Sequence, residues 1–220
     1  MENVKAIIFD AYGTLFDVNS AAEKCKDKIG DKWEGFANFW RTTQLEYTWL
    51  RSLMDRHKDF WQVTEDSLDK SMRTFNIDPS MRNELLDLYK ILSPYKEVPE
   101  ALKTLKEKKF KLAILSNGTP SLLDELVKSN HLENLFDDVF SVEQVGVYKP
   151  SSKVYDMPIK KYNINKSEVA FLSANTWDVS GGGNYGYQSI WVNRNNTIFD
   201  NLYFKPKYQI TDLTKLIQLI

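Results

Sequence analysis

The stretch VKAIIFDAYGTLFD, residues 4 to 17, decides the fold that this sequence predicts. Val4 to Phe9 is a short and nearly continuous apolar run, which is typical of a strand that is buried on both of its faces. Asp10 follows the run directly, and an Ala-Tyr-Gly turn comes after it. The stretch therefore predicts a central strand that ends on a carboxylate.

Helical patterns alternate with further short apolar runs along the rest of the chain. The runs are residues 112–116 (LAILS), 169–173 (VAFLS) and 189–192 (SIWV), and the helical patterns cover residues 97–108, 120–130 and 151–162. Helices that join parallel strands return over the faces of the sheet. The alternation therefore predicts an α/β fold in which a parallel sheet is flanked by helices.

Residues 18–93 interrupt this alternation, since they contain helical patterns and no convincing strand. Within them Trp33, Phe36, Ala37 and Trp40 recur at the spacing that places apolar side chains on one face of a helix. Because both ends of the segment adjoin the predicted sheet domain, we expect it to fold back over the sheet as a cap. The predicted domains are an α/β core of residues 1–17 and 94–220 and a helical cap of residues 18–93.

Composition excludes several kinds of protein and site. The 29 Lys and Arg residues nearly balance the 30 Asp and Glu residues, and a net charge of -1 gives no long-range field for nucleic acid or an anionic membrane. A single cysteine, Cys25, excludes an intramolecular disulfide and any multi-cysteine metal site. No apolar stretch approaches the ~18 residues of a membrane span. We therefore expect a cytoplasmic protein that acts on a small molecule.

Polar residues follow three of the predicted strands. Asp10 ends the first, Ser116 and Asn117 end the second, and residues 173–178 follow the third. Open parallel sheets bind their ligands in the crevice beyond the carboxyl ends of the strands. Together with Lys149 of the segment VYKPSSKVY, these residues predict a single site at that edge of the sheet.

Four motifs, in this order, resemble those of the haloacid dehalogenase superfamily. They are FDAYGTL around Asp10, LSNG around Ser116, YKP around Lys149 and LSANTWDVSGG around Asp178. The set extends over residues 9–183, most of the chain. The resemblance implies a Rossmann-like core and a helical cap inserted after the first strand.

Three features are similar to one branch of that superfamily, the L-2-haloacid dehalogenases. They are DAYGTLFD, Arg41 within FWRTTQLEYTWL, and SANTWDVSG. This resemblance implies a homodimeric hydrolase that converts (S)-2-haloalkanoic acids to (R)-2-hydroxyalkanoic acids and halide without a cofactor.

Tyr12 distinguishes this branch from the phosphatases of the superfamily. In those enzymes a second Asp at this position acts as acid and base, and a further acidic cluster helps to hold magnesium. Here Asp178 is joined by Ser173 and Asn175, and two carboxylates make a poor cage for Mg²⁺. We therefore expect metal-free attack on carbon. A phosphatase is the alternative, and a non-catalytic binding protein is disfavoured because Asp10 and Lys149 are both present.

The resemblance also implies a catalytic set. Its members are Asp10, Thr14, Lys149, Tyr155, Ser173, Asn175 and Asp178. Asp10 would attack C2 of the substrate as a covalent nucleophile, Lys149 would favour its ionised form, and Thr14 would hydrogen-bond it. Asp178 would be the base for attack of water on the resulting ester. Two alternatives stay open: Asp178 could only orient Lys149, and Tyr155 could only pack on the sheet.

Halide binding is implied for Arg41, with Asn117 and Trp177 as companions. A guanidinium stays charged at any working pH and presents several donors to a developing anion. From the sequence alone, however, an Arg on an amphipathic helix is normally a solvated residue, and a lone Trp is more often part of a core.

The other substrate contacts are implied to lie on opposite sides of the pocket. Ser116 and the backbone N–H groups after Asp10, beginning with that of Ala11, would hold the substrate carboxylate, since clustered backbone donors bind an anion without net charge. Tyr12, Leu45 and Phe60 would form the apolar wall, although Phe60 could equally belong to the core of the cap.

Overall fold

A six-stranded parallel sheet forms the centre of the molecule, as the alternating pattern predicts. The computed structural model describes residues 1–220. The strands are β1 (Ala6–Phe9), β2 (Lys111–Ser116), β3 (Asp138–Ser141), β4 (Val169–Ser173), β5 (Gln188–Val192) and β6 (Tyr208–Ile210), in the order β3-β2-β1-β4-β5-β6. In the register of the sheet Phe9 lies opposite Ile114 and Leu172. The segment after β1 therefore emerges at the middle of the carboxyl edge.

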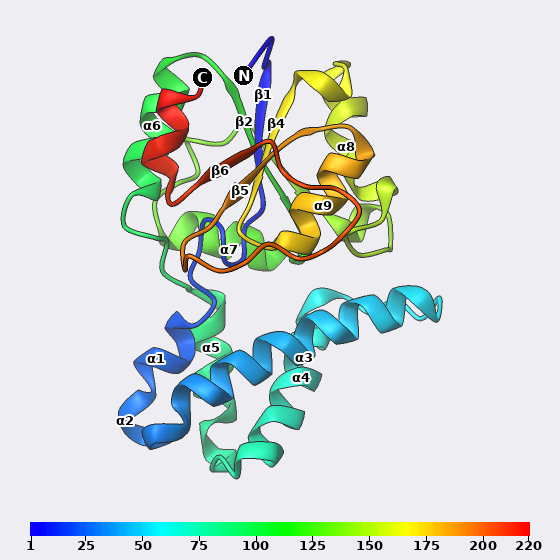
Figure 1. The fold of residues 1–220 in the computed structure, drawn as a ribbon. Coiled ribbons are helices and arrows are strands. Elements are labelled where there is room, and N and C mark those ends of the chain that lie inside the picture. The colour runs from blue at the N-terminus through cyan, green and yellow to red at the C-terminus, as the bar shows by residue number, and fades with distance from the viewer.

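Helices cover both faces of this sheet (Figure 1). They are α6 (Val98–Glu107) and α7 (Pro120–Ser129) on one side, and α8 (Ser152–Tyr162) and α9 (Thr176–Tyr185) on the other. With faces covered on both sides, β1 and β4 are buried at every position. Because both faces of these two strands are buried, their sequences are continuous apolar runs.

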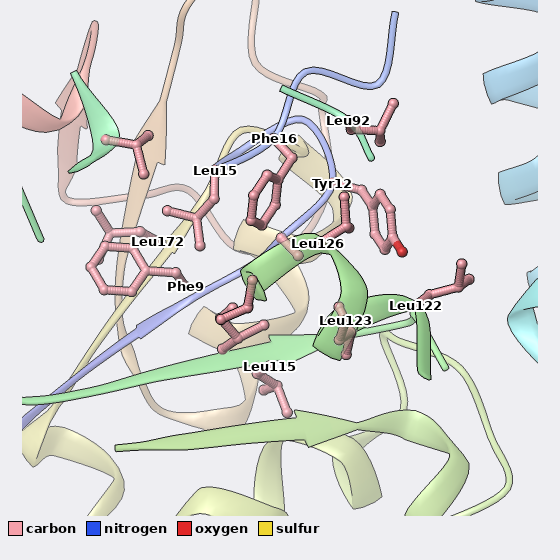
Figure 2. Packing of buried hydrophobic residues seen from close by; sticks show 14 of the residues in the cluster. Phe9, Tyr12, Leu15, Phe16, Leu92, Leu115, Leu122, Leu123, Leu126 and Leu172 are labelled. Atoms are coloured by element: carbon pink, nitrogen blue, oxygen red, sulfur yellow. The ribbon is translucent and has the colours of Figure 1, made fainter. Parts of the chain in front are cut away.

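The ends of β1, β2 and β4 are held in a tightly packed apolar cluster. Phe9 of β1 and Leu172 of β4 lie on the face of the sheet that α7 covers, near Leu123 and Leu126 (Figure 2), whereas Leu115 of β2 points to the opposite face. All five side chains are fully buried. Close packing of this kind leaves the backbone at the carboxyl edge little freedom to shift.

Five helices form a separate layer beyond the carboxyl edge of the sheet (Figure 1). They are α1 (Ser20–Lys24), α2 (Lys26–Ile29), α3 (Trp33–Leu53), α4 (Phe60–Phe75) and α5 (Arg82–Lys90). On α3 the predicted apolar face is buried at Phe36, Ala37 and Trp40. The side chain of Asp59 caps α4 by accepting a hydrogen bond from the N–H of Gln62 at 2.9 Å. We call α1 to α5 the helical layer.

The chain crosses between the sheet and the helical layer twice, and the two crossings pair with each other. We call residues 11–19 the first linker and residues 91–97 the second linker. The N–H of Asp17 donates to the carbonyl of Ser93 at 2.9 Å, and the N–H of Tyr95 donates to the carbonyl of Leu15 at 3.0 Å. The helical layer is therefore joined to the sheet by a short two-stranded connection.

Two strands differ from the sequence prediction, which contains neither β3 nor β6. Both lie at the outer edges of the sheet and are only partly buried, and β6 has three residues. Because a half-covered edge strand needs no continuous apolar run, DVFS and YQI carry no strong strand pattern. None of the helices is both long and apolar enough to cross a membrane.

Candidate active site

Asp10 directly follows β1 and is only 5% exposed. Its backbone N–H donates to the carbonyl of Leu172 at 2.9 Å, so the hydrogen-bond ladder of the sheet fixes the residue. The carboxylate oxygen Oδ2 accepts three hydrogen bonds, from Thr14 Oγ1 at 3.0 Å, Ser173 Oγ at 3.3 Å and Asn175 Nδ2 at 2.8 Å. We call these three residues the cradle. The other oxygen, Oδ1, accepts a hydrogen bond from Lys149 Nζ at 3.1 Å.

Neighbouring backbone groups fix the direction of the cradle donors. Thr14 Oγ1 accepts the N–H of Ala174 at 2.8 Å, and Ser173 Oγ accepts the N–H of Asn175 at 3.1 Å. Since each hydroxyl already accepts an N–H, its own proton is free to point to Asp10. The amide of Asn175 also donates to the carbonyl of Tyr12 at 3.1 Å, which holds the turn after Asp10 in place.

Lys149 joins two carboxylates in the interior of the protein. Its Nζ lies 3.1 Å from Asp10 Oδ1 and 2.8 Å from Asp178 Oδ2, and the side chains of Lys149 and Asp178 are wholly buried. Tyr155 completes the network by donating its phenol proton to Asp178 Oδ1 at 2.7 Å. A buried charge is tolerated only when it is paired and hydrogen-bonded. The two carboxylates and the ammonium therefore form one ionic unit.

This burial changes the proton affinities of the network. Burial raises the pKa of Asp178 to about 6, against the opposing effect of Lys149, and the charge of Asp10 adds to the rise. Burial and the neighbouring Asp178 raise the pKa of Tyr155 well above its usual range. Tyr155 therefore remains a hydrogen-bond donor, whereas Asp178 can exchange a proton near neutral pH.

Glycines bring α9, which carries Asp178, close to the sheet. A Cβ on Gly182 would lie 2.6 Å from Phe171 of β4, and one on Gly181 would lie 2.4 Å from the Tyr155 hydroxyl. Neither distance leaves room for a methyl group. The glycine run therefore serves close packing of helix on sheet.

Free donors surround the turn after Asp10. The backbone N–H groups of Ala11 and Tyr12 have no hydrogen-bond partner within the chain. Ser116, at the end of β2, is fully buried, and its Oγ accepts the N–H of Gly118 at 3.1 Å. The adjacent Asn117 accepts the backbone N–H of Lys149 through Oδ1 at 3.1 Å. Clustered donors of this kind bind an anion without any excess of basic residues.

Aromatic rings from the helical layer close over Tyr12. The Tyr12 ring lies 5.2 Å from that of Phe60 and is stacked on that of Tyr89 at 5.7 Å, measured between centroids. Gly118 makes room on the other side, because a Cβ there would lie 2.9 Å from Tyr12. The Tyr12 hydroxyl is buried without a hydrogen-bond partner. The wall that faces the strand ends is thus largely apolar.

Arg41 lies half-buried on α3 near these rings. Its Nη1 donates to Gln44 Oε1 at 2.8 Å. Burial raises the pKa of Tyr12 and of Tyr89, and the charge of Arg41 opposes both rises. Arg41 therefore brings a positive charge to the aromatic wall of the site.

The comparisons with known proteins agree with this geometry. The family model for haloacid dehalogenase-like hydrolases matches residues 4–186. An (S)-2-haloacid dehalogenase of Pseudomonas sp. (strain YL) is 39% identical over 221 residues, which cover 100% of this chain and 95% of that protein. The chain belongs to the L-2-haloacid dehalogenase family.

Solved structures of this dehalogenase family share the fold closely. The crystal structure of one dehalogenase, 34% identical, has a TM-score of 0.98 and covers 100% of this chain and 98% of its own. The L-2-haloacid dehalogenase of Xanthobacter autotrophicus with chloropropionic acid covalently bound is 33% identical, with a TM-score of 0.89 and 98% of each chain covered. The α/β fold and the family predicted from the motifs are therefore confirmed.

Two residues that the sequence predicts for the dehalogenase site, Trp177 and Leu45, make no direct contact with Asp10 in the structure. Trp177 packs edge-on against Trp49 of α3 at 5.4 Å between centroids, and both line an open cavity of about 590 Å³. Leu45 is half-buried on α3. Neither residue forms a hydrogen bond with Asp10. Phe60, by contrast, packs on the ring of Tyr12, two residues after Asp10.

Two residues absent from the sequence prediction support the dehalogenase site from the helical layer. Gln44 holds Arg41 through Oε1, and its Nε2 donates to Thr64 Oγ1 at 2.7 Å and to the Tyr89 hydroxyl at 3.0 Å. Tyr89 in turn stacks on Tyr12. The role of Gln44 could have been inferred from its position three residues after Arg41, since side chains three residues apart meet on a helix.

Proposed function

We propose that this protein hydrolyses the carbon–halogen bond of short (S)-2-haloalkanoic acids to give (R)-2-hydroxyalkanoic acids and halide. The observation that carries the proposal is the unequal surroundings of the two Asp10 oxygens. Oδ2 has three donors from the cradle, and Oδ1 has one from Lys149. A carboxylate held in this way keeps one oxygen for attack and the other for stabilisation by hydrogen bonds.

In the first step Oδ1 of Asp10 attacks C2 of the substrate from the side opposite to the halogen. The C–O bond forms as the carbon–halogen bond breaks, so the configuration at C2 inverts and halide leaves. Lys149 fixes the carboxylate through its ion pair at 3.1 Å, and fixed placement supplies much of the rate. The Ala11 and Tyr12 N–H groups with Ser116 would hold the carboxylate of the substrate, and Arg41 would receive the halide with Asn117 and Trp177.

In the second step water attacks the carboxyl carbon of the Asp10 ester. Oδ2 is then the ester carbonyl oxygen, and negative charge develops on it within reach of the cradle donors. Donors preplaced at a developing oxyanion lower the barrier. Asp178 takes the proton from water as general base, and a pKa of about 6 suits that task near neutral pH. The bond between the carboxyl carbon and Oδ1 then breaks, and the leaving alkoxide takes the proton that Asp178 received. Asp10 gives up the remaining proton of the water to solvent and is again a carboxylate, and the hydroxy acid departs with the C2 configuration set in the first step.

An isotope experiment with a single turnover tests the covalent route. With enzyme in excess over (S)-2-chloropropionate in oxygen-18 water, the product should carry ordinary oxygen, because its new oxygen comes from Asp10. Mass spectrometry of the peptide that contains Asp10 should show one heavy oxygen gained. Heavy oxygen in the first-turnover product would instead mean direct attack by water, and the proposal would be wrong. The R enantiomer, run in parallel, should release no halide.

The phosphatase alternative is separated by its need for metal. Lys149 Nζ stands between the carboxylates of Asp10 and Asp178, at 3.1 and 2.8 Å, where a phosphatase of the same fold would need carboxylates free for magnesium. Halide release should therefore persist in EDTA. Hydrolysis of phosphate esters that is lost in EDTA and restored by magnesium would favour the phosphatase.

We further propose that residues 18–93 act as a cap domain over a core of residues 1–17 and 94–220. In support, the helical layer lies beyond the carboxyl edge of the sheet (Figure 1). Phe60 of α4 packs on the ring of Tyr12, two residues after Asp10, and the charge of Arg41 of α3 acts on the same tyrosine. The proposed setting is the cytoplasm, and the proposed assembly is a homodimer.

A further inference from the structure

Arg194 lies where the two linkers meet the sheet. It follows β5, in a turn that Asn193 closes by accepting the N–H of Thr197 at 2.9 Å and donating to the Thr197 carbonyl at 3.0 Å. Its side chain is 10% exposed, and its guanidinium covers the ring of Tyr95 in the second linker, 3.8 Å from the centroid. The turn therefore delivers a nearly buried cation to the connection between sheet and helical layer.

The two ends of the guanidinium bind one residue from each linker. Nη2 donates to the backbone carbonyl of Thr14 at 2.7 Å, and Nη1 lies 2.7 Å from Glu97 Oε1. Arginine can do this because its donors stand in a rigid planar fork. Lysine carries its donors on one nitrogen and cannot reproduce the two separate donor positions of this fork.

Thr14 is therefore held from both of its ends. Its hydroxyl donates to Asp10 Oδ2 at 3.0 Å and accepts the N–H of Ala174 at 2.8 Å, while its carbonyl is bound by Arg194. No other side chain donates to this carbonyl. A shift of the Thr14 backbone would move the hydroxyl that orients the nucleophile.

Arg194 is not optimised for stability alone. Its Nε is buried without a hydrogen-bond partner, and a buried donor left unsatisfied destabilises a fold. Its ion pair with Glu97 also brings two charges out of water, which offsets much of their attraction.

We propose that Arg194 is a positioning residue for the reaction, which orients the Asp10 carboxylate through Thr14 and ties that geometry to the second linker. The inference rests on the proposed function, because the geometry that it protects is that of the attack by Asp10. Arg194 itself touches no reacting atom. Its loss should slow formation of the Asp10 ester while substrate binding stays nearly unchanged.

The test measures single-turnover halide release from (S)-2-chloropropionate by rapid quench, with substrate concentration varied to separate rate from affinity. Arg194→Met should lower the rate of halide release at least about tenfold and change the apparent Kd by less than about threefold, since small errors in the angle of attack are costly. Arg194→Lys should restore part of the rate, because it can still reach one acceptor.

Two further variants separate positioning from charge and from general stability. Glu97→Gln keeps an acceptor for Nη1 and leaves the bond from Arg194 to Thr14 intact, so its rate should stay within about threefold of wild type. Arg82→Met removes a similar half-buried arginine, paired with Asp69 at 2.6 Å in the helical layer, and should leave the rate unchanged.

Wild-type rates for Arg194→Met would overturn the inference, as would a loss of rate in Glu97→Gln equal to that in Arg194→Met. If Arg194→Met failed to fold, Arg194→Lys would decide: the inference requires a slower rate at an unchanged unfolding midpoint. Absence of halide release by the wild-type protein would instead overturn the proposed function, which separates the two failures.

Discussion

At the scale of single residues, Asp178 is the member of the site whose protonation matters most near neutral pH. Its carboxylate binds Lys149 and Tyr155 and is fully buried, and burial raises its pKa to about 6. A general base must be ionised to act. In the ester Asp10 is uncharged and no longer adds to this rise, so the pKa of Asp178 should then lie below about 6. Hydrolysis of the Asp10 ester should therefore become faster as the pH rises toward about 6 and be level above it.

The corresponding substitution is Asp178→Asn, which keeps the size of the side chain but cannot take a proton. We expect a loss of about 10² to 10⁴ in steady-state turnover, with the Asp10 ester accumulating in the enzyme because its hydrolysis is blocked. Mass spectrometry of the intact protein after mixing with substrate would detect the added mass. If the variant lost turnover without accumulating ester, Asp178 would only orient Lys149 for the first step.

The same pKa shift has a consequence for stability. Because the folded-state pKa of Asp178 lies above its usual value of 3.8, the folded protein holds this proton more tightly than the unfolded chain does. The contribution of this group to the free energy of unfolding is therefore fully present below pH about 4 and is lost as the pH rises through about 6.

The sequence predicted the polar residues of the site better than their supports. Asp10, Lys149 and Asp178 lie at motif positions that follow buried strands or precede a proline, so their neighbourhood could be inferred from the rule for parallel sheets. Tyr89 and Arg194 act through contacts 45 to 180 residues away in sequence, such as Arg194 with Thr14. No local pattern records contacts of that range.

At the scale of elements, the sequence predicted the strands and helices that have a continuous buried apolar surface. The strands at 4–9, 112–116, 169–173 and 189–192 are β1, β2, β4 and β5, because burial on both faces demands unbroken apolar runs. The helices at 97–108, 120–130 and 151–162 are α6, α7 and α8 within one or two residues. By contrast, α9 contains three consecutive glycines, and its helical state depends on close tertiary packing that the sequence does not reveal.

That packing predicts the effect of Gly182→Ala. The new methyl group would lie 2.6 Å from Phe171, so α9 must move away from β4 and carry Asp178 with it. We expect destabilisation of about 1–3 kcal/mol, together with slower hydrolysis of the Asp10 ester. Chemical denaturation and steady-state turnover would measure the two effects.

Gly35→Ala provides the matched control within a helix. Its methyl group would lie 3.2 Å from the edge of the Phe75 ring, a side chain that can yield slightly, and replacing a helical glycine by alanine favours the helix by about 1 kcal/mol. Gly35→Ala should therefore be neutral or stabilising and leave turnover unchanged. Equal destabilisation by both substitutions would contradict the role given to close packing under α9.

At the scale of the whole molecule, the last turns of α3 expose an apolar surface. Leu50 is 51% exposed, Leu53 82% and Met54 60%, and their spacing of three and four residues places them on one side of the helix end. Such a patch on a protein of net charge -1 is suited to burial against a second copy.

We expect Leu53→Glu to convert the proposed homodimer into a monomer, as measured by sedimentation equilibrium, because two carboxylates would then face a desolvated contact. Ile198→Glu is the control, since Ile198 is 93% exposed but belongs to the loop after β5 and not to α3. A protein that sediments as a monomer before any substitution would contradict the proposed dimer.

The depth of Asp10 also sets how substrates and products travel. With Asp10 5% exposed and Lys149 1% exposed, a haloacid cannot reach the carboxylate until the helical layer and the sheet move apart. Each turnover moves a haloacid and a water inward and a halide and a hydroxy acid outward through the same interface. Because the chain passes between the two parts only through the paired linkers, we expect it to bend there when the parts separate. The frequency of that opening then caps the rate of capture, however fast Asp10 reacts once it is reached.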